Sequence, residues 1–264
     1  MFDKLFLRKK AHRRPPPTTG GRLVYAVGDI HGRLDLLNPL IETIVADAVS
    51  LRPQRKPLLV FLGDYVDRGP ASAGVVERIL KLSYKPAFEV RTLKGNHEEA
   101  LLQFLEDPEF GQTWATHGGL ATLAAYGVQA PAGRLDADGW RRASEAFGAA
   151  LPASHRAFYK SLELTVEAGD YLFVHAGVRP GVPLNAQAER DLLWIRGEFL
   201  DAAGPFDKVV VHGHTPMEEP QILDHRLGLD TGAYATGVLT AVRLYGEERK
   251  ILQARDSRAA AAAA

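Results

Sequence analysis

Short apolar runs recur along the chain, and each ends abruptly in glycine and polar residues. They are β-branched or aromatic and four to six residues long, as expected of buried strands, and they span 22–27, 58–62, 89–93, 170–174 and 208–211. Between the first three runs, segments 34–51 and 72–82 carry apolar residues at helical spacing. This alternation of strand and helix predicts parallel strands joined by right-handed crossovers.

The rest of the chain predicts one α/β domain from about residue 21 to residue 255. Segment 99–164 is alanine-rich and helical in pattern, which indicates a helical insert that covers one flank of the candidate site. Segment 221–244 alternates polar and apolar residues, and we expect it to form hairpins of a second sheet. The predicted architecture is therefore two facing mixed sheets flanked by helices.

The composition limits which chemistry the chain can perform more than it limits which fold the chain can adopt. The 264 residues are 46% apolar and 24% charged, which is ordinary for a globular protein. Lysine plus arginine and aspartate plus glutamate both total 32, so the charge balance gives no indication of a nucleic-acid partner. The absence of cysteine excludes disulfides and thiolate metal ligands. Any metal must be held by histidine, aspartate, glutamate or asparagine.

The two ends differ from the body of the chain. Residues 1–20 are basic and then proline-rich, and we expect a flexible leader; the alternative is a weak membrane-surface anchor formed by its apolar and basic residues. Residues 256–264 end in a run of alanines, which we interpret as an appended tail. No run reaches the roughly 18 apolar residues of a membrane span. These patterns predict a cytoplasmic protein.

Candidate chemistry gathers directly after the five predicted strands. The residues there are Asp29 and His31, Asp64, Asn96 and His97, His175, and His212 and His214. Singly, each has a plain structural explanation, such as a helix cap or a packed core histidine. Ligands of open α/β sheets bind at the carboxyl ends of strands. Because metal ions allow carboxylates and imidazoles to cluster in a protein interior, the set together predicts a binuclear metal site.

Local patterns around these residues carry further expectations. The glycines before Asp29, Asp64 and Asn96 permit sharp turns and close backbone approach. Asn96 is expected to cap the following helix, with Glu98 and Glu99 in its first turn as structural residues. Trp194 and Ile195 are expected to pack against the rest of the protein. Gly118 and Gly119 predict a turn between two helices. His117 is expected to be a surface residue.

The motifs GDIHG (28–32), GDYVDRG (63–69), GNHE (95–98), HAG (175–177) and GHT (213–215) occur in one order. In this order they resemble the phosphoprotein phosphatase family of the calcineurin-like metallophosphoesterases. The flanking segments 161–181, 191–200 and 227–244 resemble its bacterial serine/threonine phosphatase branch, which includes bacteriophage and diadenosine-tetraphosphatase-like enzymes. The resemblance implies a four-layer α/β/β/α sandwich.

The resemblance also implies a role for each site residue. The first metal would take Asp29, His31 and Asp64, and the second would take Asp64, Asn96, His175 and His214. His97 would be the general acid, oriented by Asp67. Arg68 and Arg196 would clamp the phosphate, which Asn96 also faces. His212 matches no ligand position and is expected to be packed or hydrogen-bonded nearby.

One departure from the superfamily pattern concerns the first metal. Many metallophosphoesterases have a second histidine two positions after the one in the GH motif, where this chain has Pro216. This argues against a phosphodiesterase or nuclease. Nitrogen and oxygen donors accept manganese, iron, zinc, cobalt or nickel. We expect manganese to activate the enzyme in vitro.

The resemblance implies a phosphomonoesterase that uses a metal-bridging hydroxide, without a phosphoenzyme. The leading hypothesis is a serine/threonine protein phosphatase acting on phosphoproteins or phosphopeptides, with small phosphate esters as further substrates. The alternative within the same fold is a symmetrical diadenosine tetraphosphate hydrolase. A non-catalytic phosphate-binding sensor is the third hypothesis. No nucleic-acid partner is expected.

Overall fold

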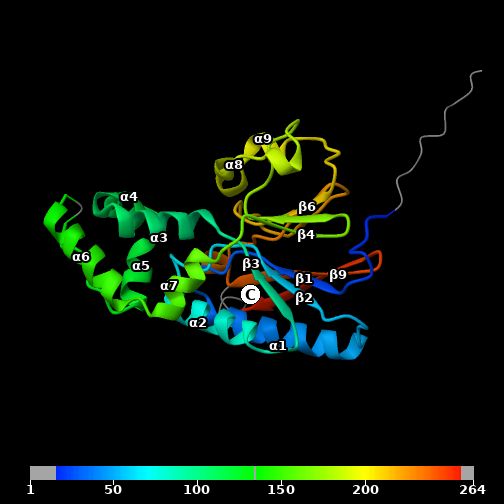
Figure 1. Cartoon of the computed structure of the whole chain (residues 1–264), viewed down its shortest axis with the longest axis horizontal. Coiled ribbons are helices and arrows are strands. Elements are labelled where there is room, and N and C mark those ends of the chain that lie inside the picture. The colour runs from blue at the N-terminus through cyan, green and yellow to red at the C-terminus, as the bar shows by residue number, and fades with distance from the viewer. Residues whose placement is uncertain (1–15, 134, 257–264) are drawn as a thin grey trace, which may run out of the picture.

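The computed structural model describes residues 16–133 and 135–256. The predicted leader before residue 16 and the predicted tail after residue 256 lie outside the described residues. Two five-stranded sheets form the centre of the fold (Figure 1). In spatial order, the first contains β10 (Glu248–Arg255), β9 (Val238–Tyr245), β1 (Val24–Val27), β2 (Leu58–Phe61) and β3 (Glu89–Thr92). The second contains β4 (Thr165–Ala168), β5 (Tyr171–Val174), β6 (Val209–His212), β8 (Arg226–Gly228) and β7 (Gln221–Ile222).

Strand pairing confirms the parallel units predicted from the alternation of strand and helix. β1 pairs with β2 and β2 with β3, both parallel, and β5 pairs with β6 in the second sheet, also parallel. Helices α1 (Leu34–Leu51) and α2 (Ser72–Ser83) form the two crossovers in the first sheet. The carboxyl ends of β1, β2 and β3 therefore lie along one edge of that sheet.

The expectation for segment 221–244 was only partly right. β7 and β8 form the predicted hairpin in the second sheet, but β9 crosses to the first sheet and pairs antiparallel with β1. Both faces of β9 are apolar, since Leu239 and Ala241 pack on the helical side and Val242 and Leu244 pack between the sheets. A strand buried on both faces fits a central position better than an exposed hairpin.

The fold has four layers, two of helices and two of sheet, and an apolar core lies between each neighbouring pair. Because successive side chains of a strand point to opposite faces, each strand contributes to the cores on both of its sides. In β1, Tyr25 and Val27 face α1 and α2, while Val24 and Ala26 face the second sheet. The second sheet in turn packs beneath α8 (Glu189–Trp194) and α9 (Gly197–Leu200). Figure 1 shows α1 and α2 on one side of the paired sheets and α8 and α9 on the other. The α/β/β/α architecture is thus confirmed.

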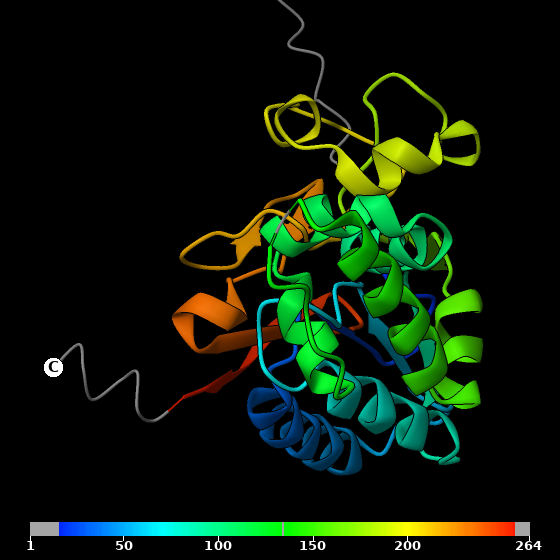
Figure 2. The ribbon, with the colours of Figure 1, turned by 90° about the vertical axis from the view of Figure 1, so that its left-hand side faces the viewer.

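Between β3 and β4 the described chain is helical. It contains α3 (Asn96–Glu106), η1 (Pro108–Phe110), α4 (Gly111–Thr116), α5 (Gly119–Ala125), α6 (Ala137–Ala150) and α7 (Ala153–Lys160). These helices form a lobe beside the sheets (Figure 1), and this lobe faces the viewer in Figure 2. The lobe has an aromatic centre in which Phe104 lies 4.9 Å from Trp114 and 6.3 Å from Phe147, measured between ring centroids. Short segments η2 (Leu184–Ala186) and α10 (Ala233–Thr236) complete the fold. None of the described helices has the length and apolar character needed to cross a membrane.

Candidate metal centre and active site

The predicted site residues come from both sheets and meet where their strands end. Two groups of buried donors form there, one of His31, Asp64 and His97 and one of Asp64, His175 and His214. Within each group the donor atoms lie within 4.8 Å of one another. Sequence analysis placed these residues after separate strands, and the fold brings them together.

Asp64 belongs to both groups, and its two carboxylate oxygens face different histidines. Oδ2 lies 3.5 Å from Nε2 of His31, and Oδ1 lies 3.5 Å from Nε2 of His175. The surrounding imidazoles outweigh the effect of burial and hold the pKa of Asp64 below its usual range. The side chain is therefore an anion placed between two sets of nitrogen donors.

Backbone carbonyls fix the orientation of two of these histidines. His31 donates from Nδ1 to the carbonyl of Val66 at 2.8 Å, and His175 donates from Nδ1 to that of Leu62 at 2.9 Å. The Nε2 lone pair of each ring is thereby directed into the centre. Burial lowers the pKa of His31 to about 3 and that of His214 to about 2. At neutral pH the rings of His31 and His214 are therefore uncharged, which is the form of imidazole that binds metal ions.

Several donor atoms in the centre fit a bound cation better than they fit one another. The Asn96 Oδ1 atom lies 2.9 Å from Nε2 of His175 and 2.8 Å from Nδ1 of His214. Because His175 carries its proton on Nδ1, its Nε2 and the amide oxygen present lone pairs to each other. Among the described residues, Asp29 Oδ1 and His214 Nε2 are buried without a hydrogen-bond partner. Lone pairs that converge, and buried nitrogen and oxygen atoms without a hydrogen-bond partner, are what a site for divalent metal ions provides.

A second buried carboxylate adjoins Asp29, and sequence analysis did not find it. Asp230, 4% exposed, follows β8 and lies close enough to Asp29 that burial and its charge both raise the pKa of Asp29. Burial likewise raises the pKa of Asp230 to about 6. Its only sequence signal was its position in a segment that resembles the family. Two adjacent buried carboxylates need a compensating positive charge, which supports the metal fit.

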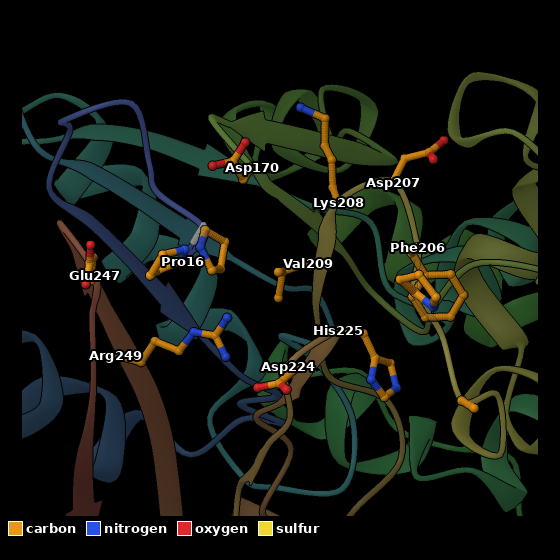
Figure 3. A pocket seen from close by; sticks show the side chains of 13 residues that line it. Pro16, Asp170, Phe206, Asp207, Lys208, Val209, Asp224, His225, Glu247 and Arg249 are labelled. Carbon is orange, nitrogen blue, oxygen red and sulfur yellow. The ribbon is translucent and has the colours of Figure 1, made fainter. Parts of the chain in front are cut away.

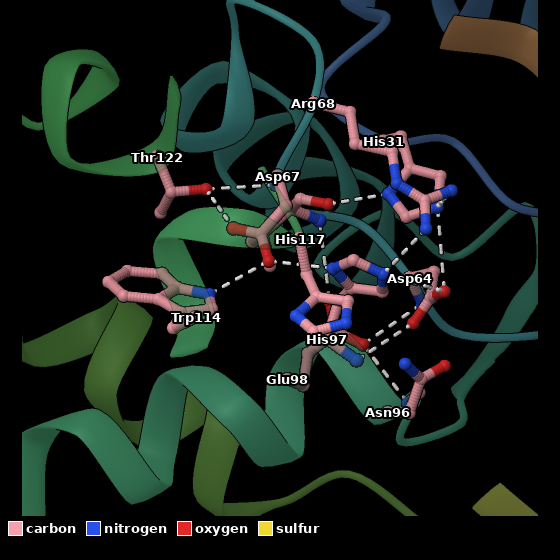
Figure 4. A network of polar contacts seen from close by, with 12 residues as sticks. His31, Asp64, Asp67, Arg68, Asn96, His97, Glu98, Trp114, His117 and Thr122 are labelled. Atoms are coloured by element: carbon pink, nitrogen blue, oxygen red, sulfur yellow. Dashed lines mark hydrogen bonds and ion pairs between the residues drawn. The ribbon is translucent and has the colours of Figure 1, made fainter. Parts of the chain in front are cut away.

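His97 forms a hydrogen-bonded chain with residues of the helical lobe (Figure 4). Its Nδ1 lies 2.7 Å from Asp67 Oδ2, which also accepts a hydrogen bond from Trp114 Nε1 at 2.8 Å. Thr122 donates to the other oxygen of Asp67 at 2.6 Å. Burial lowers the pKa of His97, but the charge of Asp64 and the bond to Asp67 outweigh it, and the net pKa is raised. His97 is thus held in one orientation and favoured in its protonated form.

Trp114 and Thr122 were not expected as site residues. They come from α4 and α5, whose sequences read as ordinary amphipathic helices. No motif marks a residue whose role is to orient another side chain. Only the packing of the lobe on the sheets places both donors around Asp67.

Two arginines lie at the mouth of the centre. Arg68 is half-buried, with Nη1 and Nη2 each 3.1 Å from Nε2 of His31 and His97, and its guanidinium lies 4.5 Å above the ring of Tyr234. Arg196 is exposed, yet its charge helps to lower the pKa of His175 and His214. Arg68 is therefore in contact with the centre, and Arg196 lies near enough for its charge to act on two of the histidines.

The backbone around the centre is strained in a way that an ordinary turn is not. Five of the six non-glycine residues with positive φ among the described residues are His31, Asp64, Asp67, Arg68 and His214. Such conformations cost energy and are concentrated at functional sites. Gly95 also needs to be glycine, because a Cβ there would lie 2.1 Å from Asp64 Oδ1. The expected close approach before Asn96 is therefore confirmed.

The predicted cap of α3 was wrong in one residue. Asn96 is the first helical residue, and Gly95 is the N-cap. This shift frees the Asn96 side chain to face the centre. Glu98 completes the cap and is fully buried, with its carboxylate accepting backbone N–H groups of Asp64 and Gly95 at 2.9 and 3.0 Å and of Tyr65 at 2.8 Å. It ties the loop that carries Asp64 to α3.

Replacing Glu98 by glutamine is expected to destabilise the fold by about 1–3 kcal/mol, since the new amide group faces backbone donors that need an acceptor. Urea denaturation measures this loss. Glu106→Gln, at an exposed position of the same helix, is the matched control and is expected to change stability by less than about 0.5 kcal/mol. Equal stability of the two variants would contradict a structural role for Glu98.

The structure also places the residues near the site for which a packing or surface role was expected. His212 is buried beside Phe199, with ring centroids 5.0 Å apart, and does not join either donor group, as expected. Gly118 lies at the turn between α4 and α5 with φ of 106°, and His117 is exposed, as expected. Ile195 packs as expected, and Trp194 packs in part, with its ring centroid 6.2 Å from that of His214 while the side chain stays 41% exposed.

A large cavity of about 1240 Å³ lies elsewhere (Figure 3). Its lining includes Asp170, Lys208 and Val209, which stand at the start of β5 and β6. The metal donors follow the opposite ends of these strands. The cavity is therefore separate from the candidate centre.

Comparison with known proteins shows the family of this chain and agrees with its fold. A model described as calcineurin-like phosphoesterase matches residues 23–238, and the chain belongs to this family. The chain is 27% identical over 236 residues to bis(5'-nucleosyl)-tetraphosphatase PrpE (asymmetrical) of Anoxybacillus flavithermus, covering 82% of this chain and 88% of that relative.

Two solved structures share the fold. One is titled a putative diadenosine tetraphosphatase, with a TM-score of 0.61 and 21% identity, covering 91% of this chain and 97% of that one. The other is a protein serine/threonine phosphatase from Saccharomyces cerevisiae, with a TM-score of 0.51 and 16% identity; the match covers 90% of this chain and 81% of that one. At these identities the structures support the fold alone.

Proposed function

We propose that this metallophosphoesterase is a phosphomonoesterase, specifically a serine/threonine protein phosphatase that transfers the phosphoryl group directly to water. The observation that carries the proposal is the His97–Asp67 pair, 2.7 Å apart and supported by Trp114. The alkoxide of serine or threonine is a poor leaving group and needs a proton. A buried, oriented imidazole with a raised pKa can donate one.

The donor groups fit two divalent cations. In this proposal the first is held by Asp29, His31 and Asp64, and the second by Asp64, Asn96, His175 and His214. When bound, such a pair supplies an acidified water and neutralises phosphate charge. Manganese is the cation we propose for activity in vitro.

Side chains of the protein bind the phosphate and transfer the proton. Arg68 and Arg196 bind the phosphate oxygens through planar guanidinium groups, which suit the spread charge of the transition state. Arg68 is already oriented by the ring of Tyr234. Asp67 keeps the Nδ1 proton on His97 and directs Nε2 to the centre. In the structure Nε2 accepts from Arg68; once Arg68 turns to the phosphate, Nε2 carries the proton and delivers it to the departing oxygen.

A second candidate is the hydrolysis of dinucleoside tetraphosphates. It is supported by the activity named for the relative from Anoxybacillus flavithermus, since the match spans most of both chains. That name specifies asymmetrical cleavage, whereas the alternative drawn from the sequence was symmetrical. A polyphosphate is a better leaving group than an alkoxide and has less need of His97, so the geometry favours the monoester.

The substrate panel that tests this proposal compares initial rates on a phosphoserine peptide, p-nitrophenyl phosphate, a phosphodiester and diadenosine tetraphosphate, each with manganese and with chelator. We expect manganese-dependent phosphate release from the peptide and the monoester, with little turnover of the other two. Faster cleavage of the tetraphosphate than of the peptide would replace the first candidate with the second.

A further inference from the structure

The cavity of about 1240 Å³ lies at the end of the sandwich opposite the candidate metal centre (Figure 3). Turns from both sheets line it, with Asp224 between β7 and β8, Glu247 between β9 and β10, and Asp207 in the loop before β6. A pocket for a small molecule usually has a volume of about 300–1,000 Å³. This cavity is larger, and it therefore suits a segment of polypeptide better than a small molecule.

Three carboxylates of the lining are open to a partner. Asp207, Asp224 and Glu247 are exposed, and none of their side chains forms a hydrogen bond or ion pair with another described residue. The two cations of the lining are already engaged, since Lys208 and Arg249 each donate to a backbone carbonyl, at 2.7 and 2.9 Å. The cavity thus presents negative charge that its own lining leaves unpaired, and this charge favours a basic occupant.

Apolar surface lies beside the three open carboxylates. Pro16, Pro205, Phe206 and Val209 also line the cavity. The ring of Phe206 is packed against that of Phe199, with centroids 5.4 Å apart, so this part of the wall is held in place. An occupant that carries apolar side chains or methylene groups as well as positive charge would match both kinds of surface.

The described chain begins at the wall of this cavity. Pro16 is part of the lining, and the residues that follow it are tied to the turn between β4 and β5. There the backbone N–H of Thr18 donates to Asp170 Oδ2, and the backbone N–H of Asp170 donates to the carbonyl of Thr18, each at 2.8 Å. These bonds fix the point from which residues 1–15 extend.

The sequence of residues 1–15 complements the cavity. It contains six lysines and arginines, one aspartate and four residues that are phenylalanine or leucine. Arg13 stands three positions before Pro16, and three residues span at most about 11 Å. A short tether also gives a segment an effective concentration on the order of millimolar at its site. A separate basic peptide lacks this advantage, which favours the chain's own leader as the occupant.

From these observations we infer that residues 1–15 bind in the cavity of their own chain, with lysines and arginines paired to the three open carboxylates and apolar side chains against Phe206. The patterns in the sequence were compatible with a flexible leader or with a membrane-surface anchor, and docking is a third role. Because the cavity and the candidate metal centre lie at opposite ends of the sandwich, docking does not depend on the proposed function.

Disulfide cross-linking in the full chain tests this docking, because the chain has no cysteine of its own. Ala11→Cys and Ala203→Cys place one thiol in the leader and one in the lining of the cavity without changing any charge. Under mild oxidation we expect a disulfide within one chain, identified by mass spectrometry of the digested protein. Its rate of formation is expected to fall as salt is added, because exposed charges are screened.

The decisive comparison replaces the three open carboxylates by amides in the same two-cysteine chain, as Asp207→Asn, Asp224→Asn and Glu247→Gln. The reach of the leader is unchanged and only its attraction is lost, so we expect cross-linking to be about 3- to 100-fold slower. The matched control removes three exposed carboxylates of the helical lobe, and it is expected to keep the original rate. Its substitutions are Glu106→Gln, Glu109→Gln and Glu145→Gln.

Three results would overturn the inference. An unchanged rate in the cavity variant would mean that the leader meets the second thiol without docking. A disulfide that joins two chains and is lost on dilution would mean that the leader of a second copy fills the cavity. Equal slowing by the helical-lobe control would mean that net charge, and no particular site, attracts the leader. None of these results bears on phosphate ester hydrolysis, which is tested separately.

Discussion

Replacing Asp64 by asparagine is expected to lower kcat/KM for a phosphate monoester by at least about 10³-fold. Its two oxygens face His31 and His175 at 3.5 Å each, so one carboxylate serves both donor groups. An amide offers only one acceptor oxygen and no negative charge. Metal assistance is worth several kcal/mol of barrier, and each 1.36 kcal/mol is a tenfold change in rate.

Initial rates at saturating manganese measure this loss, and bound metal measured on the same samples locates it. Asp138→Asn makes the same chemical change at an exposed position of α6 and is expected to retain full activity and metal content. Thermal unfolding shows whether the Asp64 variant is folded. A folded Asp64→Asn variant with wild-type rate and metal content would contradict the shared position of this carboxylate.

Replacing His97 by alanine is expected to slow the hydrolysis of a phosphoserine peptide by about 10²–10⁴-fold, the usual value of general acid catalysis. The loss should be much smaller, about tenfold or less, for p-nitrophenyl phosphate, because nitrophenolate leaves without a proton. The ratio of kcat values for the two substrates therefore reports the acid role directly.

This ratio also separates two readings of His97. Its ring shares a donor group with His31 and Asp64, so it could act as a metal ligand instead of an acid. A ligand role predicts equal losses on both substrates and a lower metal content. Trp114→Phe removes the hydrogen bond to Asp67 and also shrinks a buried ring in the aromatic centre of the lobe, so thermal unfolding must show that the variant is folded. For a folded variant we expect a loss in the same direction as His97→Ala, smaller in size.

The sequence predicted the sheets and the metal donors because both leave local patterns. Buried strands are short apolar runs, and residues at the ends of parallel strands in one sheet meet at one edge, so Asp29, Asp64 and Asn96 could be placed together without coordinates. His175 follows a strand of the second sheet, and the facing of the two sheets brings it to the same place. The resemblance added roles to these positions. The close approach of Gly95 to Asp64 was also accessible, because only a glycine permits it.

Other features depend on packing between distant segments and leave no local signal. β9 joins the first sheet because both of its faces are apolar, which alternation alone does not distinguish from a hairpin in the second. Trp114 and Thr122 read as residues of amphipathic helices until the lobe folds over Asp67. The run that contains Trp194 reads as core, and only α8 in place on the second sheet leaves the indole exposed.

We propose that phosphate ester hydrolysis by this chain depends on two divalent cations held at the ends of these strands. The most direct test titrates manganese into chelator-treated protein and measures bound manganese per chain together with phosphate release from a phosphoserine peptide. The account predicts no release without metal and full activity as occupancy approaches two per chain. Release that persists in chelator, or two bound ions without any turnover, would contradict it.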